Sequence, residues 1–189
     1  MKQWLTNPFR HIAGGKALLI GWCAIIITIL ISFFSHAHFD GAIDMHVGRA
    51  APIAVFFMEQ LTDWLCIVFL FYAAGKVLSR SAIRFIDVAG TMALARCPLV
   101  FVAIIAFGIA VPQHGQTVES VIKGITPLFI ILSLATVLSM IWMVALMYNA
   151  FTTSCNIKGG KAIAIFAGVI ILAEIASHII LHQVYTHIN

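Results

Sequence analysis

Residues 17–34 read ALLIGWCAIIITILISFF, a stretch without a charged side chain. A helix that crosses a hydrocarbon core of about 30 Å needs roughly 20 mostly apolar residues, so this stretch predicts a transmembrane helix. It is longer than the apolar part of a signal peptide, and no Ala-x-Ala-like cleavage pattern follows it. We therefore expect it to be retained as the first membrane span.

Four more stretches of similar character follow, at residues 52–75, 88–111, 125–150 and 162–181. Of the 189 residues, 62% are hydrophobic and only 10% are charged, whereas a soluble domain has about 25% charged residues. The mean hydropathy is +1.05. This composition excludes a soluble enzyme, a disordered regulator and a small disulfide-stabilised secreted domain. The predicted fold class is all-α: a polytopic membrane bundle of five transmembrane helices, with residues 17–189 as a single domain.

The lysine and arginine residues predict the orientation, because cytosolic loops of membrane proteins are enriched in them. One side of the predicted bundle carries eight and the other only Arg49 and Lys123; the eight are Lys2, Arg10, Lys16, Lys76, Arg80, Arg84, Lys158 and Lys161. We therefore expect a multi-pass protein of the cell inner membrane, with its amino terminus in the cytosol and its carboxyl terminus outside. The net charge of +4 then reflects topology, and we expect the lipid bilayer as a partner and no nucleic acid.

Residues 1–16 predict a short cytosolic helix that lies along the membrane surface. Trp4, Leu5, Phe9 and Ile12 recur at helical spacing, and Pro8 suits the first turn of a helix. An amphipathic helix of this kind buries its apolar face among the lipid headgroups. We expect anchoring to be its main role, with partner binding as the alternative.

Four ionisable side chains fall deep within the predicted spans: Glu59, Asp63, Arg96 and Glu174. Such a group costs at least about 2.5–3.5 kcal/mol at the bilayer centre and therefore needs a partner. Counting residues along each helix places the four at similar depth, so we expect Arg96 to pair with Asp63. The other acids are either protonated and hydrogen-bonded, or form a proton or cation site. Pro98 is expected to kink the third span and free a carbonyl near this layer.

Histidines gather on the predicted outer side and suggest a divalent metal site. Glu174, His178 and His182 are spaced i, i+4, i+8 along one helix face, and His36, His38 and His46 lie in the first outer loop. Imidazoles and carboxylates together are suitable ligands for such an ion. His114 and His187 are expected on the same side. The alternative is a polar outer cap without metal, and the sequence indicates no other cofactor.

Three short segments resemble the Yip domain family (Ypt-interacting proteins), specifically its short bacterial members. They are Asn7-Pro8-Phe9 in the head, Ala93-Leu94-Ala95-Arg96-Cys97-Pro98-Leu99 in the third span, and Tyr148-Asn149-Ala150 followed by the turn Gly159-Gly160-Lys161-Ala162. The resemblance implies a five-span helical fold with a cytosolic amino terminus. Eukaryotic relatives act in vesicle traffic and bind small GTPases through longer cytosolic regions, so we do not expect GTPase binding here. The resemblance supplies no catalytic residue.

The functional expectation is a non-enzymatic integral membrane protein that organises the membrane or binds partner proteins, including other copies of itself. The alternative is a small transporter, channel or accessory subunit that handles protons or a divalent metal through the buried acids and outer histidines. An intramembrane enzyme acting on lipid is disfavoured. Glu59 and Asp63 lie one turn apart on one helix rather than facing each other, and no nucleophile has a base at a recognisable spacing.

Overall fold

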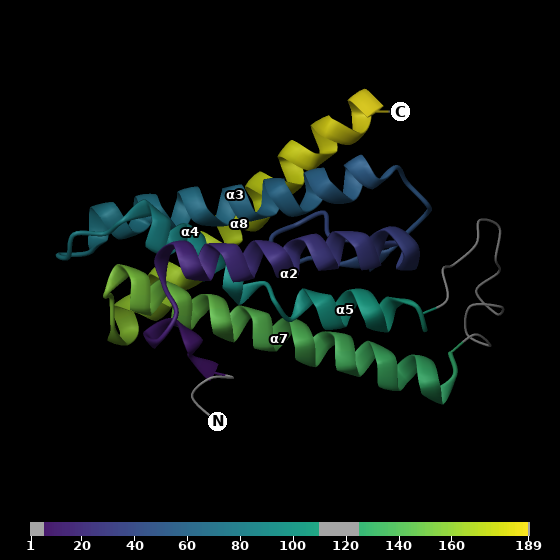
Figure 1. Ribbon diagram of the computed structural model, residues 1–189, viewed down its shortest axis with the longest axis horizontal. Helices are drawn as coiled ribbons and strands as arrows, with labels where there is room; N and C mark the ends of the chain where they lie inside the picture. Colours follow the sequence, from purple (N-terminus) through teal and green to yellow (C-terminus); the bar gives the residue numbers. More distant parts are fainter. Residues whose placement is uncertain (1–5, 110–124, 189) are drawn as a thin grey trace.

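A computed structural model describes residues 6–109 and 125–188, with side chains up to Thr186 (Figure 1). In chain order the elements are η1 (Pro8–Arg10), α2 (Gly14–Ser35), β1 (Ala37–His38), β2 (His46–Val47), α3 (Ile53–Leu78), α4 (Phe85–Ala95), α5 (Leu99–Ala106), α7 (Pro127–Cys155) and α8 (Gly159–Ile188). Five segments are long and apolar enough to cross a membrane, with α4 and α5 together forming the third. The predicted all-α fold with five spans is confirmed.

The helices extend beyond most of the predicted spans. α3 starts at Ile53 and ends at Leu78, three residues past the predicted end, and α7 continues to Cys155, five residues past its predicted end. Charged and polar residues at helix ends can remain helical in the headgroup region, where an apolar pattern gives no signal. The last predicted residue of the third span, Val111, lies outside the described residues.

The third span is broken into two helices rather than merely kinked. Residues 96–98 form a tight turn in which amides bond three residues back: Arg96 N–H donates to Ala93 O at 3.2 Å, and Leu99 N–H to Arg96 O at 2.9 Å. Pro98 has no N–H to continue the α-helical pattern, and its ring would meet the carbonyl of residue 94. The turn places Arg96 at the centre of the bundle.

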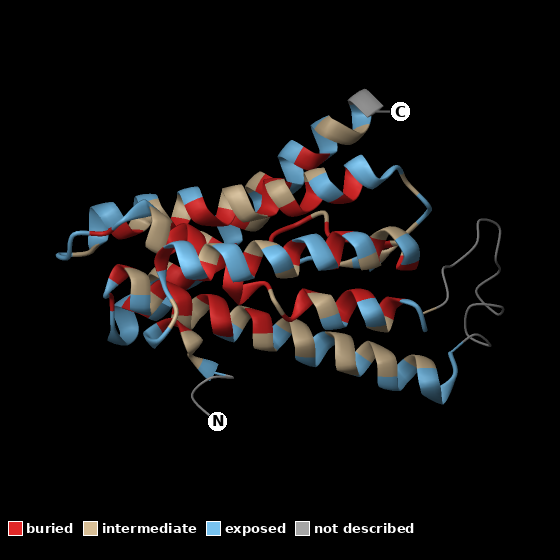
Figure 2. Cartoon of the chain, viewed as in Figure 1, coloured by how far each residue is buried: buried red, intermediate tan, exposed pale blue. Residues whose placement is uncertain are grey.

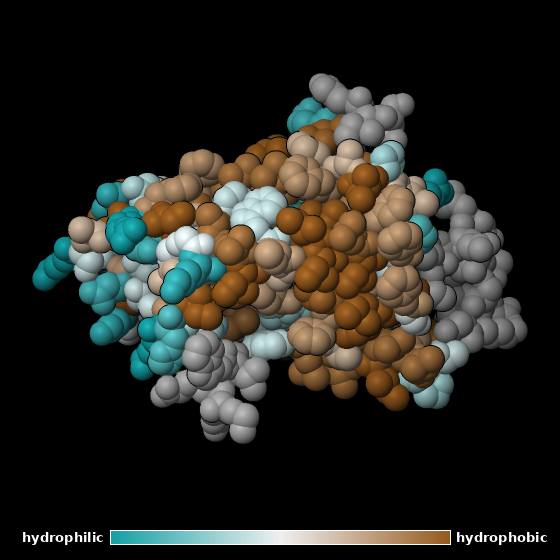
Figure 3. All heavy atoms as spheres, viewed as in Figure 1, coloured by the Kyte–Doolittle hydropathy of each residue, from teal (hydrophilic) through white to brown (hydrophobic). Residues whose placement is uncertain are grey.

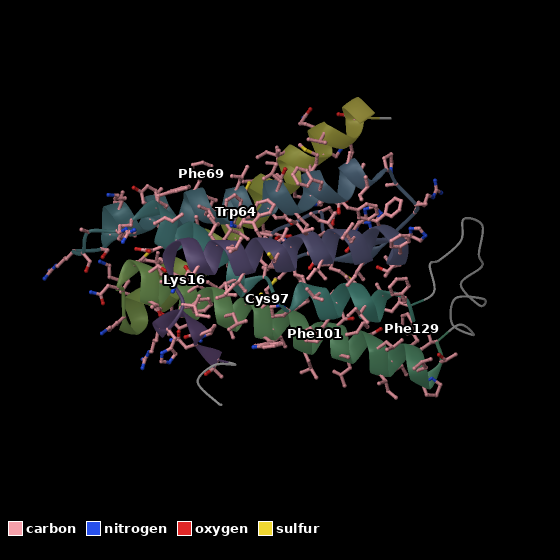
Figure 4. The ribbon with its side chains drawn as sticks, viewed as in Figure 1. Lys16, Trp64, Phe69, Cys97, Phe101 and Phe129 are labelled. Carbon is pink, nitrogen blue, oxygen red and sulfur yellow. The ribbon has the colours of Figure 1, made fainter. Side chains whose placement is uncertain are left out.

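α4 is the central helix, since every residue from Val88 to Ala95 is buried (Figure 2). Close packing depends on small residues: a Cβ atom at Gly21 of α2 would lie only 2.5 Å from the backbone of Ala93 and Leu94. Small residues allow membrane helices to approach backbone to backbone. α5 continues towards α7, where Phe101 pairs with Trp142 at 6.1 Å between ring centroids (Figure 4).

α7 ends and α8 begins at the same short turn, residues 156–158, and from there the two helices diverge towards the other end of the bundle (Figure 1). The far half of α7 therefore exposes apolar side chains, among them Ile130, Leu134, Val137 and Ile141. α8 instead packs mainly along α3. The divergence leaves a lateral opening between α7 and α8, lined on one side by Val137 and Ile141 of α7 and on the other by Ile175 and Ile179 of α8.

The two ends of the molecule differ in charge. One end, here the basic end, carries seven of the described basic residues: Arg10, Lys16, Lys76, Arg80, Arg84, Lys158 and Lys161. The opposite end, here the hairpin end, carries Arg49 among the residues that the structure describes; Lys2 and Lys123 lie outside them. Figure 3 shows hydrophilic residues gathered at the basic end and a broad hydrophobic surface over the helices.

The head of the chain differs from the predicted surface helix. Between residues 6 and 16 the structure has a three-residue 3-10 helix, and its Phe9 is only 2% exposed. Phe9 belongs to the protein core rather than to the lipid-facing side, and Asn149 Nδ2 on α7 donates to Thr6 O at 2.7 Å. A helical spacing of apolar residues does not reveal whether lipid or protein will cover them. Trp4 and Leu5 lie outside the described residues.

Candidate functional site

The loop between α2 and α3 folds back into the bundle. α2 ends at Ser35 and is capped by His36 in a left-handed conformation (φ 56°). β1 and β2 then pair antiparallel, with Ala37 opposite Val47 and His38 opposite His46. We call residues 37–47 the hairpin. Its tip points inwards between the helices (Figure 1), and Phe39 and Ala42 are each 1% exposed (Figure 2). The sequence predicts an outer loop here and gives no indication that it returns between the helices.

Glu59 on α3 is the first anchor of the hairpin. Its carboxylate is fully buried and accepts hydrogen bonds from three donors: the backbone N–H of Phe39 at 3.0 Å, the hydroxyl of Tyr185 at 2.7 Å, and the His38 ring at 2.7 Å. α3, α8 and the hairpin thus meet at one carboxyl group.

The two nitrogens of the His38 ring are both engaged. Nε2 donates to the carbonyl oxygen of Arg49 at 2.9 Å, because a carbonyl can only accept. Nδ1 faces the Glu59 carboxylate, so the charged imidazolium form satisfies both contacts. Burial lowers the pKa of His38, but the hydrogen bond and the charge of Glu59 outweigh it, and the pKa is raised above 6.5. A ring with both nitrogens occupied cannot also bind a metal ion.

Arg96 is the second anchor and lies one helical turn deeper than Glu59. Its Nη2 atom donates to Asp63 Oδ2 and to Gln60 Oε1, both at 3.1 Å, and Nη1 donates to Ala42 O at 3.4 Å. Arg96 is 1% exposed and Asp63 is not exposed at all. The guanidinium therefore joins α3 to the hairpin tip from the break between α4 and α5, where Cys97 is labelled in Figure 4.

α8 supplies the third anchor. Glu174 Oε2 accepts the N–H of Ile43 at 2.8 Å, and Ser177 Oγ accepts the N–H of Ala42 at 3.0 Å. His178 Nδ1 donates to Asp40 O at 3.1 Å. Gly41 lies against the Glu174 carboxyl so closely that a Cβ atom there would overlap it. The hairpin backbone thus gains partners for the polar groups that would otherwise be unpaired at membrane depth.

A charge pair within the hairpin closes it at the outer side. His46 Nδ1 lies 3.2 Å from Asp40 Oδ1, and the His38 and His46 rings stack with 5.4 Å between their centroids. The hydrogen bond with Asp40 raises the pKa of His46. The same bond with His46 lowers the pKa of Asp40, against the opposing effect of burial.

The structure brings together the four ionisable residues predicted to share a layer, Glu59, Asp63, Arg96 and Glu174, but around the hairpin rather than around an open site. The polar groups around the hairpin also include Gln60, Ser177, Tyr185 and the hairpin amides, none of which was predicted from the sequence. No spacing in the sequence indicates a loop that returns between helices. The neutral Gln60 and Ser177 also give no signal in a search for buried charge.

The six predicted metal ligands do not form one site. Among the residues that the structure describes, no three histidine, cysteine, aspartate or glutamate side chains are grouped so that they could hold a metal ion. His38 and His46 lie in the hairpin, whereas His182 lies with Tyr185 beside a small cavity of about 100 Å³. His36 lies at the end of α2, and Glu174 and His178 bind the hairpin tip. His114 and the His187 side chain are outside the described part.

Comparison with known families gives a match over nearly the whole chain. A family model described as Yip1 domain matches residues 2–180, which includes all three anchors of the hairpin. Searches of curated proteins and of solved structures found no match.

Proposed function

The chain belongs to the Yip1 domain family, and from that premise we propose that it is a non-enzymatic membrane protein that binds a transmembrane helix of a partner protein. The interior of the bundle supports this proposal over a transport role. Each carboxyl group of the polar layer is engaged in holding the protein together: Glu59 and Glu174 bind the hairpin, and Asp63 binds Arg96.

The observation that carries the proposal is an acidic side chain at the side of the bundle. Asp44, at the hairpin tip, is exposed, and the structure gives its carboxylate one hydrogen bond, from the N–H of its own neighbour Met45 at 2.7 Å. It lines two grooves, one of about 420 Å³ towards α7 with Val137 and Ile141, and one of about 360 Å³ towards α8. Both lie in the opening between α7 and α8.

The depth of Asp44 makes lipid alone a poor neighbour. The preceding residue, Ile43, donates its N–H to Glu174, which is the sixteenth residue of α8 and so lies about 22 Å from the start of that helix. A hydrocarbon core of about 30 Å still surrounds this level. A carboxylate there costs at least about 2.5 kcal/mol without a partner. A partner helix with an Arg, Lys or hydroxyl side chain in its apolar face would supply the missing donor and fill the groove.

Photo-crosslinking in native membranes tests this proposal. A photoreactive residue at Val137, which is 52% exposed and lines the groove, is compared with one at Leu19, which is 69% exposed on α2. We expect a discrete protein adduct at Val137 that is absent at Leu19 and is lost when Asp44→Asn is added. Equal adducts at the two positions, or an adduct at Val137 that persists with Asp44→Asn, would contradict the proposal.

We further propose that the protein lies in the cell inner membrane and that its basic end faces the cytosol. The seven described basic residues of that end support this orientation, against Arg49 at the hairpin end. Labelling by a membrane-impermeant thiol reagent tests it: a cysteine at Arg80 should be protected in intact cells, and one at Ala50 should react. The reverse pattern would overturn the orientation.

A further inference from the structure

The basic end contains a second concave region, far from the hairpin. A cavity of about 430 Å³ lies between η1, the end of α7 and the start of α8. Its lining is polar and includes Asn7, Asn149, Thr152 and Asn156. Pockets of about 300–1,000 Å³ are large enough for a small ligand. The polar layer and the grooves beside Asp44 use none of these residues.

The charge of this cavity is positive. Arg10 and Lys158 approach it from two different elements, η1 and the α7–α8 turn, and no aspartate or glutamate is among its lining residues. Among the described residues, neither side chain forms a salt bridge with an acidic residue. Two cations that share a concavity without a counter-charge favour an anion between them.

Neutral groups at the cavity also favour the binding of an anion. Asn7 Oδ1 lines this region, is buried and has no hydrogen-bond partner among the described residues. A half-turn of the amide would present its NH2 group instead, as a donor. Gly159, which begins α8, also lines the cavity, and no acidic side chain lies in the first turn of this helix. Gly159 and Gly160 are exposed, and Cβ atoms there would meet nothing within 4 Å, so the start of α8 is open.

We propose that this cavity binds a phosphate group, held by Arg10, Lys158 and the first amides of α8. Arginine and lysine side chains together with a helix amino terminus are an established combination for phosphate recognition. The cavity lies at the end of the transmembrane helices, at the level of lipid headgroups. A phospholipid headgroup and a soluble phosphate ester share this chemistry, and the experiment below separates them.

The test is native mass spectrometry of the full chain released from detergent, with short-chain phosphatidylglycerol, inorganic phosphate and a phosphate-free glycolipid as probes. We compare the wild type with Arg10→Gln/Lys158→Gln and with a matched control, Lys16→Gln/Arg80→Gln. The control removes the same charge from the same end of the molecule, but its residues do not line the cavity. Circular dichroism establishes that both variants are folded.

We expect phosphatidylglycerol to bind the wild type and the control, and to bind the cavity variant about tenfold or more weakly, since hydrogen bonds to charged groups are the stronger class. Inorganic phosphate that displaces the lipid would show that the phosphate alone is recognised. Lipid binding that phosphate cannot displace would indicate a headgroup site. Equal losses in the two variants, or equal binding of the glycolipid, would overturn the proposal.

If the cavity variant does not fold, Gly160→Asp provides a second test. The new carboxylate would stand beside the first amides of α8, where nothing lies within 4 Å of a Cβ atom. It should compete with phosphate and abolish lipid binding while the helix itself is stabilised. Undiminished lipid binding by this variant would contradict the proposal.

Discussion

Replacement of Glu59 by alanine should release the hairpin from the bundle. The side chain is fully buried and accepts from Phe39 N–H, Tyr185 Oη and the His38 ring. Breaking a buried charge pair by removing one partner typically costs about 3–5 kcal/mol, because the other partner is left uncompensated. With about 1.4 kcal/mol for each factor of ten, local opening of the hairpin should become roughly 10² to 10⁴ times more frequent.

Hydrogen–deuterium exchange of the hairpin amides measures this opening directly. Phe39 and Ala42 donate to buried acceptors and Ile43 to the half-buried Glu174 in the wild type, so their amides should exchange slowly, those of Phe39 and Ala42 most of all. Glu59→Gln keeps the shape and one acceptor oxygen and should give an intermediate rate. Asp44→Asn is the matched control, since Asp44 lies in the same hairpin but binds only its neighbour's amide. A folded Glu59→Ala protein whose hairpin exchanges within tenfold of the wild type would refute the reasoning.

Three further predictions follow from the same contacts. First, because the pKa of His46 is raised above 6.5 and that of Asp40 lowered below 3.8, their pairing stabilises the hairpin fully between about these two values. It is lost as pH rises through the raised histidine pKa or falls through the lowered carboxyl pKa. Intrinsic-rate-corrected exchange against pH should show this window, and His46→Ala should reduce the dependence to the part that His38 contributes, whose pKa is also raised. Second, Gly21→Ala should destabilise the protein by about 1–3 kcal/mol through overpacking against Ala93. Gly168→Ala should not destabilise it, because a Cβ atom at Gly168 meets nothing within 4 Å. Thermal denaturation in detergent compares the two variants, and equal midpoints would contradict the packing argument. Third, EDTA treatment should leave hydrogen–deuterium exchange of the hairpin amides unchanged, since among the described residues no three candidate ligands are grouped for a metal. Faster exchange after chelation would mean that a metal holds the hairpin.

Much of the architecture was predictable because hydrophobicity acts over long stretches. A continuous apolar run such as residues 17–34 is rarely anything but a membrane span. α2 contains the whole run and starts three residues before it, at Gly14. The depth count along the helices also placed Arg96 and Asp63 at one level, and they lie 3.1 Å apart. Counting residues along a helix is reliable because the rise per residue is fixed.

The hairpin was not predictable, because nothing local in the sequence distinguishes it from an exposed loop. Its stability depends on hydrogen-bond partners from α3, α8 and the break between α4 and α5, between 20 and 135 positions away along the chain. Every amino acid except proline has the same backbone N–H group, so the sequence does not show which of these groups binds a distant partner. Phe9 shows the same limit, since an apolar side chain does not encode whether lipid or protein will cover it.

The contacts of the hairpin also fix an order of assembly during synthesis. The hairpin leaves the ribosome before Glu59 and Arg96, and well before Glu174 and Ser177 on the last helix. Until α8 has been inserted, the amides of Ala42 and Ile43 have no acceptor at membrane depth, and water is their only alternative partner. The hairpin therefore completes its hydrogen bonds only after α8 has been inserted, so that its closure marks a completed molecule.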